Sequence, residues 1–182
     1  LAIRSVTGNV RIAAGRSTGG GVKVSASNGA VAGRGASVRA DLSSGGTGGV
    51  TVESRTQALL GRVQGPGAMV VTTTAGSIDV TKLVSTADSI RLDATGGDIA
   101  LANGNAATSA RLTATGDIAV TGALNAGTDV IIDAGGTVTF GARTTSAGNV
   151  NITAATIDLD RAVAGRALSL TATGGDLTLG TG

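Results

Sequence analysis

The chain has no cysteine, histidine, tryptophan or tyrosine among its 182 residues, and only one proline and one phenylalanine. Without cysteine and histidine it has no thiol nucleophile, no histidine general base and no zinc site built on those ligands. Because aromatic residues make up 1% of the chain, nucleic-acid bases have almost nothing on which to stack, and we expect no nucleic-acid partner. The 14 basic and 12 acidic residues leave a net charge of +2, which is too small for a large positive field.

Long apolar runs are also missing. Runs such as Val130-Ile131-Ile132 fall far short of the roughly 20 residues that cross a bilayer, so we expect no transmembrane segment. The 31 glycines show no third-residue period, which excludes collagen. With 41% apolar and 14% charged residues, the composition is not that of a disordered chain. The apolar residues are mostly Val, Ile, Leu and Ala, which suit a thin, repetitive core.

Short apolar triplets recur along the chain at intervals close to 20 residues. The first and third residues of each triplet point to the same side of an extended strand. A first series starts at positions 10, 50, 90, 130 and 150, has weaker members at 30, 70 and 110, and ends at position 168. A second series starts at positions 78, 99, 118, 138, 157 and 177. Before position 78 this second series blurs into Val22, Val38 and Leu59-Leu60.

The triplets are bounded by Gly, Asn, Asp, Ser and Thr, which is typical of strands and turns rather than helices. A three-residue strand cannot bury its side chains alone, but stacked turns of chain form parallel sheets around one core. The sequence therefore predicts an all-β fold, a right-handed parallel β-helix (β-solenoid) of about nine coils of 19–20 residues. We expect residues 1–182 to form one such repeat segment, with a weakly marked third strand near residues 103–107, 124 and 143–145.

The phrases GNVRIAA, LTATGDIAVTGALNAGTDVIIDAGGTVTF and GNVNITAATIDL resemble the repeats of filamentous-haemagglutinin-like exoproteins, the passengers of two-partner secretion. The shared signature is a G-N/D-V-x-I/L strand, a T/D-A-x-G turn and a G-D/T-I/V-x-V/L strand. The match is best over residues 77–182 and looser over residues 1–76. The resemblance implies a right-handed β-helical shaft, secreted or displayed on the surface of a Gram-negative bacterium.

The same resemblance implies the partners of the whole protein. One is an outer-membrane secretion transporter, and another is a host or neighbouring-cell surface contacted through regions outside this segment. The specialised N-terminal secretion domain of that family is not visible in the sequence. We therefore expect the chain to be a fragment of a much longer one.

Two aspartates are candidates for a metal site. Asp98 and Asp117 precede strands of the second series at the same coil position, and we expect them to stack about 4.8 Å apart. Like charges at that spacing repel unless a cation or hydrogen-bond donors intervene. Calcium prefers carboxylate and carbonyl oxygens, but turn aspartates also commonly bond backbone N–H groups. We expect no metal or other cofactor and keep the two aspartates as calcium candidates.

A second cluster raises the question of catalysis. Asp93 and Asp133 occupy equivalent positions two coils apart, and Arg91 and Arg111 are adjacent in the stack and point outward. A carbohydrate-cleaving enzyme would place such residues across a walled groove, whereas ordinary ion pairing on a solvated face contributes little. The sequence has no histidine and no long insertion to wall a groove, so we expect no catalytic residues and no enzymatic activity.

Two apolar residues are candidates for lateral contact with another rod or a partner. Val71 and Ile131 stand at the middle, outward positions of their triplets. An outward apolar residue can mark such a contact, although scattered single ones usually have no role. Residues 59–67 depart from the pattern, and we expect a loop bulging from the coil there.

The repeat indicates a structural role. The leading hypothesis is a non-enzymatic shaft segment of a secreted, surface-displayed bacterial adhesin-like exoprotein, a stiff spacer for adhesion or biofilm formation. The first alternative is a self-assembling extracellular filament or sheath subunit that polymerises through coil ends or lateral faces. The second alternative is a glycan-binding or glycan-cleaving β-helix.

Overall fold

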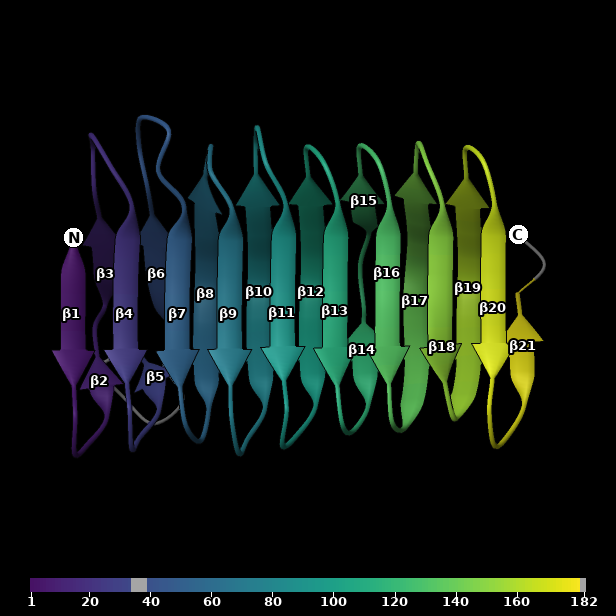
Figure 1. Cartoon of the computed structure of the whole chain (residues 1–182), viewed down its shortest axis with the longest axis horizontal. Helices are drawn as coiled ribbons and strands as arrows, with labels where there is room; N and C mark the ends of the chain where they lie inside the picture. The colour runs from purple at the N-terminus through teal and green to yellow at the C-terminus, as the bar shows by residue number, and fades with distance from the viewer. Residues whose placement is uncertain (34–38, 181–182) are drawn as a thin grey trace.

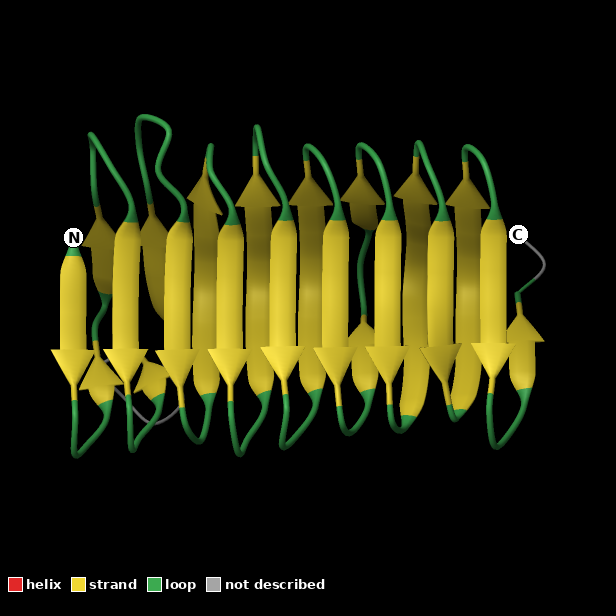
Figure 2. Ribbon diagram, in the orientation of Figure 1, coloured by secondary structure: helices red, strands yellow, loops and turns green. Residues whose placement is uncertain are grey.

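The computed structural model describes residues 1–33 and 39–180. All regular secondary structure in these residues is β-strand. The strands form two parallel sheets that wind around a common axis as a β-solenoid (Figures 1 and 2). In Figure 1 the strands of the front sheet run downward, those of the back sheet run upward, and the chain advances from left to right. This winding is right-handed, so the predicted fold class is confirmed.

Sheet A, the front sheet, has nine strands, and sheet B, the back sheet, has twelve. Sheet A consists of β1 (Ala2–Ser5), β4 (Val22–Ala26), β7 (Val50–Ser54), β9 (Met69–Thr73), β11 (Ile90–Ala94), β13 (Ala110–Ala114), β16 (Val130–Ala134), β18 (Val150–Ala154) and β20 (Leu168–Ala172). Sheet B consists of β2 (Val10–Arg11), β3 (Ala14–Arg16), β5 (Val31–Ala32), β6 (Ala40–Ser43), β8 (Ala58–Gly65), β10 (Ile78–Ser85), β12 (Ile99–Ala106), β14 (Ile118–Val120), β15 (Leu124–Ala126), β17 (Thr137–Ser146), β19 (Thr156–Ala164) and β21 (Leu177–Leu179).

The coils are not all the same length. Neighbouring strands of sheet A pair at spacings of 18 to 21 residues, except that Val22 pairs with Val50, 28 residues later. Most of the extra residues come between β5 and β6, two strands of sheet B. There Val31 and Ala40 pair with Ala58 and Leu60, which are only two positions apart on β8.

A single apolar core runs through the stacked coils. One inward column of sheet A passes through Val24, Val52, Val71, Leu92, Leu112, Ile132 and Ile152, each at most 1% exposed. The opposing column of sheet B includes the buried residues Ile78, Ile99, Ile118, Val138 and Ile157. Burying each such side chain contributes about 1.5–3 kcal/mol, and each coil covers the core of the next.

The structure corrects the predicted phase of the first coils. Val10, assigned to the first series, lies in sheet B on β2, and Val22, assigned to the second, lies in sheet A on β4. The 28-residue coil causes this exchange, because an insertion shifts every later triplet relative to a 20-residue count. Val38 lies outside the described residues.

Two further expectations about local structure have mixed outcomes. The loop expected at residues 59–67 is wrong over most of its length, because β8 runs unbroken through residue 65. Of the three stretches expected to form a third strand, the one at residue 124 is a separate element, β15. Residues 103–106 and 143–145 instead lie in the second halves of the long strands β12 and β17.

Candidate functional site

Asp98 and Asp117 lie directly before β12 and β14, and they stack as predicted because Ile99 pairs with Ile118. The N–H of Asp117 donates to Oδ1 of Asp98 at 2.9 Å, and the N–H of Thr137 donates to Oδ1 of Asp117 at 2.7 Å. Each carboxylate therefore caps a backbone group of the next coil. The repulsion expected between them is offset by these hydrogen-bond donors.

The glycine before each capped residue makes room for this arrangement. A Cβ on Gly116 would overlap Oδ1 of Asp98, and a Cβ on Gly136 would overlap Oδ1 of Asp117. The same pairing of a side-chain oxygen with a glycine-preceded amide recurs at Asn9 with Gly29 and Ala30, at Asp41 with Gly61 and Arg62, and at Asp129 with Gly148 and Asn149. The repeated Gly-Asp phrase thus serves coil-to-coil hydrogen bonding.

This geometry also bears on the calcium candidates. One oxygen of Asp98 and one of Asp117 already accept a backbone N–H. Within residues 1–33 and 39–180, no three acidic side chains gather into a group able to hold a metal ion. Backbone capping accounts for both aspartates, and the expected absence of a metal at their carboxylates stays a prediction.

The second candidate cluster lies on the outer face of sheet A. Arg91 and Asp93 on β11 form an ion pair with 3.0 Å between Nη2 and Oδ2, and the Arg91 side chain is 56% exposed. Arg111 on β13 pairs in register with Arg91, as predicted. Thr113 separates Asp93 from Asp133, which places the two carboxylate-bearing positions about 10 Å apart. A solvated ion pair contributes little, and the absence of enzymatic activity stays a prediction.

The outward position predicted for Val71 is wrong. Val71 is fully buried, because Met69 and Val71 pair with Ile90 and Leu92 and point into the core. A shift of one residue in register turns every side chain of a strand to the other face. Ile131 does point outward and is partly exposed on β16, but its predicted lateral contact remains untested.

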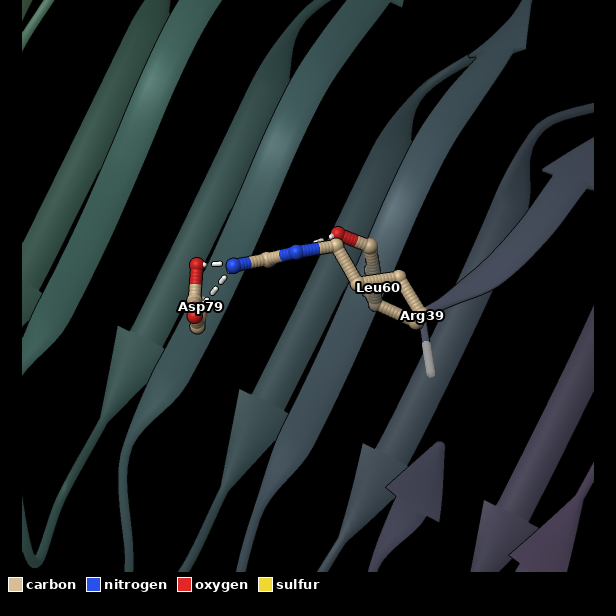
Figure 3. A network of polar contacts seen from close by, with 3 residues as sticks. All are labelled: Arg39, Leu60 and Asp79. Carbon is tan, nitrogen blue, oxygen red and sulfur yellow. Dashed lines mark hydrogen bonds and ion pairs between the residues drawn. The ribbon is translucent and has the colours of Figure 1, made fainter. Parts of the chain in front are cut away.

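One interaction on the outer face of sheet B was not predicted from the sequence. The guanidinium of Arg39 binds both carboxylate oxygens of Asp79 at 2.7 Å and also donates to the carbonyl of Leu60 at 3.2 Å (Figure 3). The hydrogen bond with Asp79 raises the pKa of Arg39 above its ordinary value. Because both side chains are about a third exposed, solvent screens the pair. It joins the residue directly before β6 to β10, two coils further on.

No helix among the described residues is long and apolar enough to cross a membrane. Comparisons of the chain with protein families, with curated proteins and with solved structures found no match. The architecture itself is that of a β-helical repeat protein, with parallel strands stacked coil upon coil in two sheets.

Proposed function

We propose that this chain is a shaft segment of a secreted, surface-displayed, adhesin-like exoprotein of the filamentous-haemagglutinin type. Its function is that of a stiff spacer without enzymatic activity. An outer-membrane transporter exports the whole protein, and regions outside this segment contact the host or neighbouring cell.

The observation that carries this proposal is the uninterrupted stacking of the coils. The nine strands of sheet A pair in chain order, and sheet B follows the same order beside them. The core continues between the sheets from Val10 to Leu159. At about 4.8 Å per coil, the stack is about 40 Å long. Such a structure holds its ends at a fixed distance, because bending or stretching would break coil-to-coil hydrogen bonds.

The proposal predicts that attachment depends on the folded length of the segment and not on its surface. In the full-length exoprotein, residues 1–182 are exchanged either for an unrelated β-helix with the same number of coils or for a Gly/Ser linker with the same number of residues. We expect the β-helix exchange to keep cell attachment and the linker exchange to reduce it strongly. Antibody labelling of the cell surface checks that equal amounts are displayed.

The opposite pattern would contradict the spacer. If the unrelated β-helix is displayed normally but attachment is lost, the surface of this segment acts directly in adhesion. If the flexible linker supports full attachment, stiffness has no role.

The same coil-on-coil stacking is compatible with a second candidate, a filament subunit joined through coil ends. The last coil exposes the leucine side chains of Leu168, Leu177 and Leu179, which are 44%, 42% and 48% exposed. Further coils of the same chain cover such a surface in a shaft, whereas a neighbouring subunit covers it in a filament. Images of the native particle distinguish the two, because only a filament shows separate chains repeating along its axis.

A further inference from the structure

Two columns of polar side chains line the outer face of the second half of the sheet B strands. Pairing in register aligns Arg62 on β8 with Lys82 on β10, and Lys82 with Asn103 on β12. Two coils beyond Asn103 the column resumes on β17 and β19, where Arg143 pairs with Arg161. The parallel column runs through Gln64, Val84, Asn105, Asn125 and Thr145. Successive positions in each column lie about 4.8 Å apart along the rod.

Among the described residues, no acidic side chain forms an ion pair with the four cations of this face, Arg62, Lys82, Arg143 and Arg161. The ion pairs of the described part of the chain are Lys23–Glu53, Arg39–Asp79 and Arg91–Asp93, and none includes a cation of this face. Arg62 and Lys82 are both exposed and stand on adjacent strands, where their like charges repel. Asp41 borders the face, and its Oδ1 accepts the backbone N–H of Arg62 at 2.7 Å. An anion bound between Arg62 and Lys82 would relieve their repulsion.

A shallow groove accompanies the cations. An open cavity of about 340 Å³ is lined by Arg62, Lys82, Asn103, Asn105 and Asn125, among others. The amides of Asn103 and Asn105 are exposed and form no hydrogen bond within the described residues, whereas Oδ1 of Asn125 accepts the hydroxyl of Thr145. Each amide offers donors and an acceptor of the kind that hydroxyl groups bind. Two cations are thus followed by three asparagine amides along one groove parallel to the rod axis.

The side chains that line the groove fit some anionic ligands better than others. The single phenylalanine of the chain, Phe140, is buried, so the groove has no aromatic ring on which a nucleic-acid base could stack. The lining includes Val84, Ala123 and Leu83, but Leu83 is fully buried and no large exposed apolar side chain is available to insert into a lipid surface. Carboxylates with many neighbouring hydroxyls match the groove best.

We propose that this groove binds an acidic polysaccharide whose sugars carry carboxylates, a polyuronate, lying along the rod. Arg62 and Lys82 bind its carboxylates, and Asn103, Asn105 and Asn125 bind its hydroxyls. The inference goes beyond the spacer function, because a spacer needs no ligand. Two columns at strand spacing allow successive sugars to meet successive side chains along the rod, with Arg143 and Arg161 extending the contact.

The test measures binding of the full chain to polygalacturonate by biolayer interferometry, with dextran as a neutral probe and single-stranded DNA as a polyanion without sugar carboxylates. The variant is R62Q/K82Q. The matched control is R91Q/R111Q, which removes two charges at adjacent register positions on the outer face of sheet A. Circular dichroism and thermal unfolding verify that both variants fold.

We expect polygalacturonate to bind the unaltered chain, with an affinity that falls as the salt concentration rises. In R62Q/K82Q the affinity should fall about tenfold. The control should stay within about twofold. A second variant, N103A/N105A, keeps the charge and should weaken polygalacturonate binding without changing its salt dependence.

Three results would overturn the proposal. One is an absence of polygalacturonate binding by the unaltered chain. Another is an equal loss in R62Q/K82Q and in R91Q/R111Q, which would indicate a net-charge effect rather than a site. The third is equal affinity for single-stranded DNA, which would reduce the groove to a general polyanion surface.

Discussion

Replacing Gly116 by alanine tests whether the Gly-Asp phrase links one coil to the next. A Cβ at this position would overlap Oδ1 of Asp98 and lie 3.1 Å from its Cγ. The carboxylate would have to move away from Gly116. It would then lose the hydrogen bond that it accepts from the N–H of Asp117 at 2.9 Å.

The size of the effect follows from two opposing contributions. A hydrogen bond to a charged group contributes about 1.5–3 kcal/mol, and the exposure of Asp98 places this one at the lower end. Alanine in place of glycine restricts the unfolded chain, which stabilises the fold by about 0.4–1 kcal/mol. We therefore expect G116A to lower the free energy of unfolding by about 1 kcal/mol.

The assay compares G116A with Gly19→Ala in denaturant unfolding and in amide hydrogen exchange. Gly19 is the matched control, because a Cβ there would meet no atom within 4 Å. G19A should leave stability unchanged or raise it slightly. The amide of Asp117 should exchange faster in G116A and at the unaltered rate in G19A.

A double-mutant cycle with Asp98→Ala isolates the interaction. Once the carboxylate is gone, most of the cost of G116A should disappear, because the Cβ no longer displaces a hydrogen-bond acceptor. The reasoning is refuted if G116A behaves like G19A, or if G116A costs as much in the D98A background as in the unaltered chain.

Further predictions concern side-chain direction and coil spacing. Val71→Asp should destabilise the fold by about 3 kcal/mol or more, since it buries a charge in the core. Ile131→Asp should change stability by less than about 1 kcal/mol, because this side chain points outward. Equal losses of stability in thermal unfolding would contradict the register of β9. Because the chain has no cysteine, spin labels at Thr51→Cys and Asn151→Cys report one distance. Five strand steps of sheet A separate these residues, so double electron–electron resonance should give a narrow distance distribution centred near about 24 Å plus the length of the label side chains. A broad distance distribution would argue against a stiff stack.

The sequence predicted the solenoid because its core obeys a strict rule. From Ile90 onward, each inward residue must meet its counterpart one coil later, so the period survives in the triplets. Turns and insertions obey no such rule, since they need not match a counterpart one coil later. The insertion between Val31 and Ala40 therefore broke the count, and the exchange of Val10 and Val22 between sheets followed.

The candidate sites were predictable to different degrees. The stacking of Asp98 on Asp117 could be predicted from their shared place before a triplet, but their backbone partners depend on the fit of Gly116 and Gly136. The cation column was missed, because only strand pairing brings such residues into line. The 20-residue spacing of Arg62 and Lys82 was the one signal that the sequence held. The ion pair between Arg39 and Asp79 depends on the insertion and left no pattern in the sequence.

The most direct test of the central claim is electron microscopy of the native, full-length particle, with the chain traced along it. The account predicts a thin rod made of one chain, much longer than this segment, attached to the cell at one end and lengthening by about 4.8 Å for each coil. Separate chains repeating head to tail or side by side along a fibre would contradict the spacer and would make the coil ends and outer faces of this segment the functional sites.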